Sequence, residues 1–164
     1  MSKQGKANID IVELAERYYE DVVAFCTRRV GYDRAGDMAQ ETFLTAQRIA
    51  GKFQGKSTVK TWLLGIANNH CREECRRHGR EILADPEVFE LPDNGPELVE
   101  RVVLEEAILK LTLEHREVVV LHELDGLTYD EISGVLGVPS GTVKSRLHHA
   151  FVHLRKNLGV SVPA

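Results

Sequence analysis

Apolar residues recur at spacings of three and four along most of this 164-residue chain, which is the spacing of one face of an α-helix. In the first half this pattern predicts three helices: Ile11 to Arg29, Asp37 to Ala50 after a short break framed by Gly31 and Gly36, and a third that Ser57 or Thr58 caps and that runs through Trp62 into an arginine-rich end. No convincing alternation of apolar and polar residues, the mark of a half-buried strand, is found. The pattern therefore predicts an all-α fold.

The second half of the chain continues the helical pattern. Glu97 to Leu111 and Glu114 to Leu124 are each predicted to form a helix. The run Val118 to Leu121 is entirely apolar, so a buried parallel strand is the alternative for that run. Polar residues flank the run at helical spacing, and this favours the helix.

The strongest local pattern lies in residues 126–158. Thr128 and Glu131 have the spacing of a capping box, in which each side chain accepts a hydrogen bond from the backbone N–H of the other residue. Leu127 and Ile132 are placed as the hydrophobic staple that accompanies such a cap. A short helix is therefore predicted to begin after Thr128.

A second helix is predicted after a glycine turn. Gly137 suits the left-handed residue that ends a helix, and Ser140 is predicted to cap the next one. This next helix has an apolar inner face, formed by Val143, Leu147, Ala150 and Leu154. Residues 139–157 include basic but no acidic side chains. Together these features predict a helix-turn-helix, whose second helix reads the major groove; a helical hairpin with a merely solvated basic face is the alternative.

Charge divides the chain into three parts. The formal net charge of −4 argues mildly against a free-standing DNA-binding protein, but residues 57–80 and 139–157 are predominantly basic. Between Glu81 and Glu100 there are acidic residues and no lysine or arginine, and three prolines interrupt the segment. We therefore expect an N-terminal domain over 8–80, a flexible acidic linker over 81–96 and a C-terminal domain over 97–160.

The chain has no predicted membrane segment. No apolar run approaches the roughly 20 residues that a membrane-spanning helix needs, and the first residues lack the apolar core of a signal peptide. We expect a cytoplasmic protein without membrane insertion, whose three cysteines are free thiols. Cys71, Cys75 and His78 fall near one helix face, so a metal or redox site is the alternative for them.

Enzymatic chemistry is not indicated. No Ser-His-Asp order, phosphate-binding loop or paired-carboxylate pocket can be argued from the sequence, so we expect no catalytic residue and no cofactor. His148, His149 and His153 on the second helix of the helix-turn-helix are as compatible with a plain surface as with DNA contacts. Trp62 has the spacing of a core residue, with base stacking as the alternative.

Three stretches resemble regions of one family in the same order. Residues 126–147, GLTYDEISGVLGVPSGTVKSRL, resemble region four of extracytoplasmic-function (ECF) sigma factors. Residues 37–46, DMAQETFLTA, resemble the helix with which these factors bind core RNA polymerase. Residues 60–69, KTWLLGIANN, with the arginine-rich tail, resemble their promoter-melting helix. Because the three stretches span nearly the whole chain, the chain is identified as resembling an ECF sigma factor.

The resemblance implies a role for particular residues. Contact with the clamp helices of the polymerase's largest subunit is expected from Asp37, Gln40, Glu41, Thr42 and Phe43. Contact with the melted minus-ten element is expected from Lys60, Asn68, Asn69, Arg72 and Arg76, with a flipped base held by the loop 51–57. Reading of the minus-thirty-five element is expected from Ser140, Thr142, Lys144, Ser145, Arg146 and His149. The acidic linker would thread a basic channel of the polymerase, and an anti-sigma factor is the expected regulatory partner.

Two positions depart from the family pattern. The family usually has a Leu-Pro pair where this chain has Leu111 and Thr112, so we expect the helix to run on there. The reading helix usually continues with small apolar residues, whereas residues 70–75 here read HCREEC. Two other functions stay open at this point: a polymerase-independent helix-turn-helix regulator, and a thiol- or zinc-based sensor that acts by protein contact.

Overall fold

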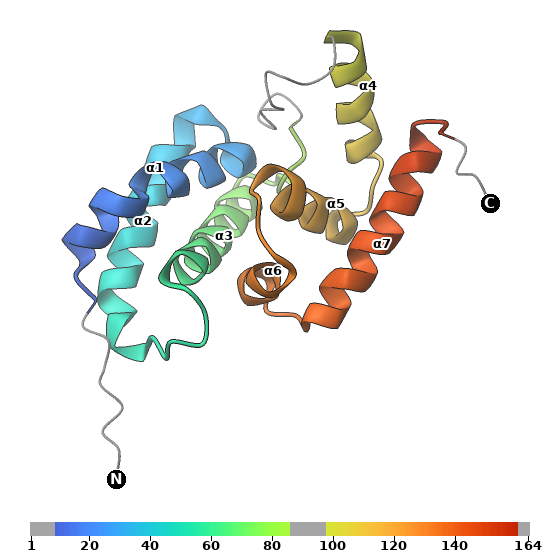
Figure 1. Cartoon of the computed structure of the whole chain (residues 1–164). Helices are drawn as coiled ribbons and strands as arrows, with labels where there is room; N and C mark the ends of the chain where they lie inside the picture. The colour runs from blue at the N-terminus through green and yellow to red at the C-terminus, as the bar shows by residue number, and fades with distance from the viewer. Residues whose placement is uncertain (1–8, 86–97, 161–164) are drawn as a thin grey trace.

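The computed structural model describes residues 9–85 and 98–160, and these form helices joined by turns (Figure 1). No strand occurs in the described part of the chain, which confirms the all-α prediction. No helix within these two ranges is sufficiently long and apolar to cross a membrane. The helices fall into two groups, one from each half of the sequence.

Three long helices form the N-terminal domain: α1 (Ile11–Val30), α2 (Tyr32–Ile49) and α3 (Val59–Arg77), with the single-turn 3₁₀ helix η1 (Ala50–Lys52) after α2. Asp10 caps α1, since its Oδ1 accepts from the backbone N–H of Val12 at 3.0 Å. Of the two predicted caps, Thr58 is the one that caps α3, accepting from the N–H of Thr61 at 3.2 Å. The three helices enclose a core that includes Phe25, Cys26, Ala39, Leu63 and Ala67.

The break between the first two helices is shorter than the sequence pattern suggested. Gly31, with φ 86° and ψ 167°, interrupts the helix alone, and α2 begins at Tyr32 rather than at Asp37. The prediction that Gly36 frames the break is therefore wrong. Ala35 is buried and anchors the added turn, whose N–H group at Ala35 donates to the carbonyl of Gly31. Core packing of this turn outweighs the low helix propensity of Gly36.

The C-terminal domain consists of α4 (Leu98–Leu109), α5 (Leu113–Val119), the π-helical turn η3 (Val120–Leu124), α6 (Tyr129–Leu136) and α7 (Ser140–Asn157). The apolar run Val118 to Leu121 is helical and fully buried, so the strand alternative is wrong. The preceding helix, α4, ends at Leu109 and so does not continue past Leu111 as expected. Thr112 ends the connection and caps α5, its side chain accepting from the N–H of His115 at 3.4 Å.

The helix-turn-helix of α6 and α7 has the predicted cap and turn. Both hydrogen bonds of the Thr128–Glu131 capping box are present. Gly137 adopts the left-handed conformation, with φ 68° and ψ 31°. One detail is wrong: Ser140 is already the first residue of α7, and Pro139 occupies the cap position without a side-chain bond. Proline can end the turn here because its fixed φ suits the entry into a helix.

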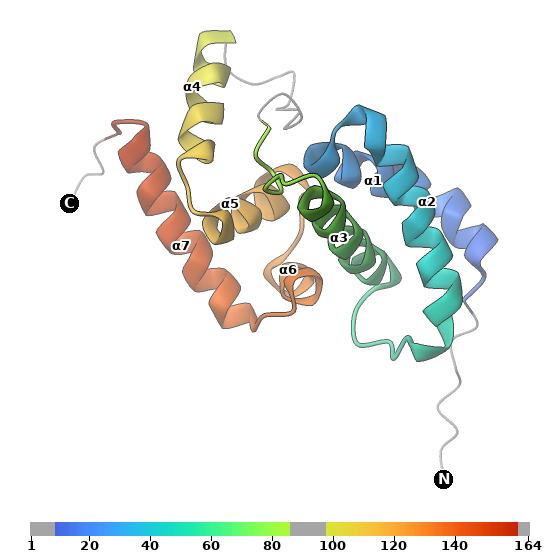
Figure 2. The same cartoon turned by 180° about the vertical axis from the view of Figure 1, so that it is seen from behind.

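The two domains lie directly against each other, with α6 and α5 beside α3 in both views of the molecule (Figures 1 and 2). The start of the predicted linker takes part in this packing, because Ile82 and Leu83 are 4% and 1% exposed. Leu83 has a positive φ of 59°, and its carbonyl accepts from Nη1 of Arg116. Most of the predicted linker, residues 86–96, lies outside the described residues.

Candidate functional site

The exposed face of α2 carries part of the predicted polymerase-binding set. Asp37, Gln40 and Glu41 are exposed, and the last two lie one helical turn after Asp37 on the same face. Thr42 and Phe43 are buried, at 0% and 8% exposure, and belong to the core of the domain. The hydroxyl of Thr42 donates to the carbonyl of Met38 at 2.7 Å, and Phe43 stacks on Tyr19 with ring centroids 6.1 Å apart. These two residues therefore support the face from inside.

Leu44 continues the exposed face and was not among the predicted contacts. Its side chain is 57% exposed, although its neighbours on the same face are polar or charged. A large aliphatic residue on the polar side of an amphipathic helix is the sequence signal that could have identified it. We define the α2 stripe as Asp37, Gln40, Glu41 and Leu44.

A shallow cavity of about 380 Å³ borders the α2 stripe, between α2 and α3. Asp37, Gln40 and Glu41 line it from α2, and the opposite wall comes from α3. Arg34 spans the two helices: its Nη1 donates to Asp37 at 3.0 Å and its Nε to Glu74 at 2.8 Å. The hydrogen bond from Arg34 holds the pKa of Glu74 below its usual value. Ion pairs of Arg34 therefore link the α2 stripe to α3.

The predicted minus-ten contacts on α3 fall into different environments. Asn69 and Arg76 are exposed, and Arg76 Nε donates to Glu73 at 3.0 Å. Lys60 is half-exposed, with its Nζ 3.8 Å from Asp21. The structure does not bring all five residues to one open surface, because the remaining two lie toward the other domain.

Asn68 and Arg72 are the two that lie toward the C-terminal domain, and the side chain of Arg72 stays 46% exposed there. Asn68 is 3% exposed. Arg72 forms an ion pair with Glu117 of α5, a residue of the C-terminal domain. Arg72 and Asn68 follow Gly65 and Thr61 at spacings of three and four on α3, so the four residues form one helix face. We call Thr61, Gly65, Asn68 and Arg72 the α3 stripe.

Trp62 and Phe53 stabilise the loop that precedes α3. Their ring centroids are 5.1 Å apart, and Trp62 packs against the core. The core-packing prediction for Trp62 is therefore confirmed. Phe53 follows η1, so the ring contact fixes one end of the loop that was expected to hold a flipped base.

The N-terminal half of α7 presents most of the predicted DNA-reading residues to solvent. Ser140, Lys144, Ser145 and His149 are exposed. Thr142 and Arg146 are half-buried. These six residues lie on the outer side of α7, because Val143, Leu147, Ala150 and Leu154 face the core of the domain.

Arg146 is oriented by the neighbouring helix. Its Nη2 lies 3.4 Å from a carboxylate oxygen of Glu114 on α5. Beside it, His115 packs against His149 and His153 of α7, with ring centroids 6.5 and 5.6 Å apart. Burial, followed by the charges of His153 and His149, lowers the pKa of His115, so this ring is neutral at pH 7.

A second groove, of about 400 Å³, lies where the N-termini of α6 and α7 meet. Thr128, Tyr129 and Asp130 line it from the first helix, and Ser140 and Lys144 from the second. Helix N-termini have free N–H groups and a partial positive charge, and Lys144 adds a full one. Lys144 and the helix N-termini attract a phosphate of a nucleic-acid backbone, while the carboxylate of Asp130 in the same groove opposes it.

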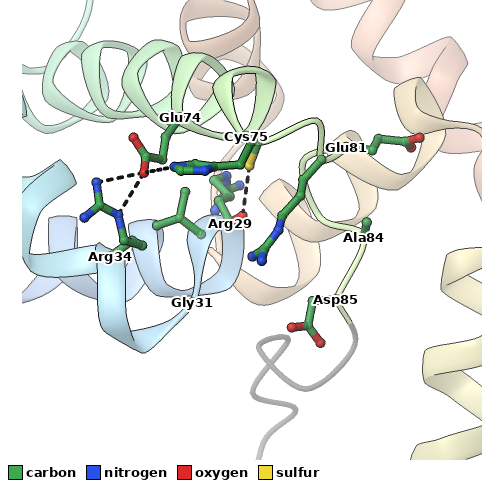
Figure 3. A pocket seen from close by; sticks show the side chains of 11 residues that line it. Arg29, Gly31, Arg34, Glu74, Cys75, Glu81, Ala84 and Asp85 are labelled. Carbon is green, nitrogen blue, oxygen red and sulfur yellow. Dashed lines mark hydrogen bonds and ion pairs between the residues drawn. The ribbon is translucent and has the colours of Figure 1, made fainter.

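The cysteines do not form a metal site in the described residues, where no three His, Cys, Asp or Glu side chains are grouped closely enough to hold an ion. A hydrogen bond with Cys26, followed by burial, raises the pKa of Cys71, and burial raises the pKa of Cys75. Both are therefore thiols at neutral pH. His78 bonds Glu74 at 3.0 Å, in a cavity of about 440 Å³ at the end of α3 (Figure 3).

The comparisons with known proteins cover both domains. Residues 14–81 match the model of sigma-70 region 2, and residues 101–154 match that of sigma-70 region 4. The chain is 31% identical to the RNA polymerase sigma factor YlaC of Bacillus subtilis over 90% of this chain and 91% of that protein. It is 34% identical to the ECF RNA polymerase sigma-E factor of Haemophilus influenzae over 84% and 81%.

A solved structure has the same arrangement of helices. It is the sigma factor RpoE of Bartonella quintana in complex with the anti-sigma factor NepR, which is 25% identical in sequence. The TM-score is 0.67, and the match covers 93% of this chain and 99% of that one. Together with the region models and the full-length relatives, this shows that the chain belongs to the sigma-70 family and is an RNA polymerase sigma factor of the ECF type.

Proposed function

We propose that this sigma factor divides its work between two surfaces, the α2 stripe for core RNA polymerase and the N-terminal half of α7 for the minus-thirty-five element. The observation that carries this assignment is that the two surfaces lie on different domains and are both exposed. The proposed division follows the predicted domains, 8–80 and 97–160, with the acidic segment 81–96 between them. Neither surface requires the protein to perform chemistry, so the proposed role is regulatory and non-enzymatic.

Polymerase binding by the α2 stripe combines charge with a central apolar contact. Asp37 and Glu41 provide the negative charge, and Gln40 can both donate and accept hydrogen bonds. Leu44 adds apolar area, which is the component of an interface that contributes most to affinity. The buried Thr42 and Phe43 act indirectly in this proposal, by holding the backbone of the stripe in place.

Promoter reading by α7 rests on the chemistry of its first turns. Arg146 and Lys144 can donate to guanine, and Ser140, Thr142 and Ser145 can bond several bases or phosphates. Glu114 holds Arg146 in a fixed direction before DNA arrives. A held guanidinium loses less side-chain entropy on binding than a free one, so this ion pair favours specificity.

Promoter melting is assigned to α3 and the loop before it. Opening DNA costs roughly 1–2 kcal/mol for each base-pair step, so the separated strand must be held by stacking, hydrogen bonds or phosphate contacts. Asn69 and Arg76 are accessible for this, and Lys60 is partly so. Arg72 is also exposed but is paired with Glu117, whereas Asn68 is buried.

Regulation by an anti-sigma factor in the cytoplasm is a further part of the proposal. It is supported by the similarity to RpoE of Bartonella quintana, which was solved as a complex with NepR. An anti-sigma factor can act by covering either of the two surfaces, because each is needed for initiation.

Run-off transcription with purified core polymerase and a library of promoter sequences tests the proposed function. The expected result is a family of transcripts that start downstream of two shared sequence elements and that require both proteins. A chain that bound duplex DNA tightly without polymerase, and gave no transcripts with it, would instead be a polymerase-independent regulator. Direct core-polymerase binding, measured without DNA, separates a failure at the α2 stripe from a failure at α7.

A further inference from the structure

The cavity at the end of α3 is a feature that the proposed function leaves unused. It encloses about 440 Å³, and small-molecule sites in proteins span roughly 300–1,000 Å³. Its walls come from the end of α1, the start of α2, the end of α3 and the segment 80–85 that follows (Figure 3). None of the residues assigned to polymerase or promoter contact lines it. A role for this cavity is therefore separate from those contacts.

Basic side chains gather on one part of the cavity wall. Arg34, His78 and Arg80 line the cavity, and all three also line an adjoining cavity of about 470 Å³ at the start of α2. Arg29, the fourth basic residue of the wall, is already paired with Asp125 at 2.8 Å. Guanidinium groups present forked donors that match the oxygens of a phosphate or carboxylate. The place where the two cavities meet therefore attracts an anion.

The acid nearest to these groups does not balance them. A single oxygen of Glu74 accepts from Nε of Arg34 at 2.8 Å and lies 3.0 Å from Nε2 of His78. Within the described residues, no carboxylate forms an ion pair with Arg80. Burial raises the pKa of the Cys75 thiol, and the charge of Arg80 partly opposes this, so the guanidinium lies near that sulfur. An anionic ligand can therefore gain Arg80 as a partner without displacing a carboxylate.

The opposite end of the cavity has acidic side chains. Figure 3 shows Glu81 and Asp85 across the cavity from Arg34, with Ala84 between them in the chain. Glu81 is paired with Arg116 at 3.1 Å. Carboxylates accept hydrogen bonds, so they repel a second anionic group but bind hydroxyl groups. The two ends of the cavity therefore favour different parts of one ligand, an anion at one end and hydroxyl groups at the other.

We propose that this cavity binds a small phosphorylated sugar. Arg34, His78 and Arg80 hold the phosphate, whose three outer oxygens and charge of about −1.5 to −2 near neutral pH match three basic donors. The hydroxyl groups of the sugar donate to Glu81 and Asp85. The ligand is bound and released without a chemical step. Because the cavity is separate from the α2 stripe and from α7, this proposal does not depend on the proposed function.

A strand of nucleic acid fits the cavity less well than a sugar phosphate. Each phosphate of a strand is followed by another along the backbone, so a strand that entered the cavity would bring further negative charge toward Glu81 and Asp85. A sugar phosphate has one anionic end and no second phosphate. The acidic end of the cavity therefore favours the small ligand over a strand.

Isothermal titration calorimetry of the full chain with ribose 5-phosphate and with glucose 6-phosphate tests the proposal. At least one of the two should bind with a Kd at or below about 1 mM. Inorganic phosphate and ribose each reach only one end of the cavity, so each should bind at least about tenfold more weakly. Absence of binding by both sugar phosphates up to about 10 mM would overturn the proposal. Equal affinity for inorganic phosphate would overturn the assignment of the acidic end.

Arg80→Ala tests the basic end of the cavity. The side chain of Arg80 is exposed, and its backbone N–H, which donates to the carbonyl of Cys75 at 2.8 Å, is kept in the variant, so the fold should be unchanged. The Kd for the sugar phosphate should rise roughly 10- to 150-fold, the range expected for a charge-assisted hydrogen bond. Arg77→Ala, an exposed arginine of α3 that does not line the cavity, is the matched control and should bind like wild type.

Two outcomes with these variants would contradict the site. Equal losses in Arg80→Ala and Arg77→Ala would show attraction by overall charge rather than a site, and an unchanged Kd in Arg80→Ala would remove its basic end. A fluorescent single-stranded oligonucleotide that bound more tightly than the sugar phosphates, and that depended on Arg80, would assign the cavity to nucleic acid instead. These titrations contain neither polymerase nor promoter, so their failure is distinct from a failure of run-off transcription.

Discussion

Replacing Leu44 tests the α2 stripe with the least disturbance of the fold. Burial of a whole leucine side chain contributes about 1.5–3 kcal/mol, and 57% of Leu44 is exposed in the free protein. Covering that part against polymerase contributes about 0.9–1.7 kcal/mol. Since about 1.4 kcal/mol is tenfold in affinity, Leu44→Ala should raise the Kd for core polymerase roughly 4- to 15-fold.

Fluorescence anisotropy of labelled protein titrated with core polymerase, without DNA, measures this change. The free energy of unfolding should shift by less than about 0.5 kcal/mol, because the side chain makes few contacts in the free fold. Val152→Ala is the matched control, an aliphatic residue 47% exposed on α7, and its Kd should equal that of wild type. If Leu44→Ala also bound like wild type, the reasoning from exposed apolar area would be refuted.

Three further predictions concern the other parts of the molecule. Arg146→Ala should reduce promoter-specific transcription roughly 5- to 150-fold, which corresponds to about 1–3 kcal/mol, without changing the Kd for polymerase. Arg155→Ala, at the far end of α7, is the control and should change transcription little. Equal loss of polymerase binding in Arg146→Ala would contradict the assignment. Ile132→Ala, at a site with 0% exposure, should lower the free energy of unfolding in urea by about 2–5 kcal/mol, and a loss below 1 kcal/mol would speak against a packed helix-turn-helix core. Because Arg34 lowers the pKa of Glu74, the ionised carboxylate stabilises the fold above about pH 4.5, and that stability is lost as pH falls below it. In urea titrations, the free energy of unfolding should fall less between pH 7 and pH 4 for Glu74→Gln than for wild type. Equal decreases would show that the Arg34–Glu74 pair does not contribute to the pH dependence.

Local signals in the sequence were sufficient to predict the helices that begin or end at a strong cap. The capping box at Thr128, the left-handed Gly137 and the cap at Thr58 all depend on contacts within four residues, which spacing alone describes. Predictions failed where packing overrode such signals. Gly36 lies inside α2 because Ala35 is buried beside it, and Thr112 caps α5 although the pattern before it allowed a longer helix.

Two features of the candidate site could not be derived from the sequence, each for a physical reason. The motif predicted to bind polymerase spans both faces of α2, so it includes the buried Thr42 and Phe43 and leaves out Leu44, which the structure shows to be exposed. The domain contact, in turn, depends on residues such as Arg28 and Asp125 that are 97 positions apart. No periodicity within either segment reveals that such charges meet.

The π-helical turn at the end of α5 sets the angular register of the whole helix-turn-helix. Within η3 the N–H of Asp125 reaches the carbonyl of Val120, five residues back, at 2.9 Å, one residue more than an α-turn contains. Each residue of an α-helix advances the chain by about 100°, so deleting one residue here would rotate Asp125 away from Arg28 and Arg29, with which it forms ion pairs at 2.9 and 2.8 Å. An evolving chain could thus tune how firmly its halves hold each other by a single insertion or deletion, with every base-reading side chain left unaltered.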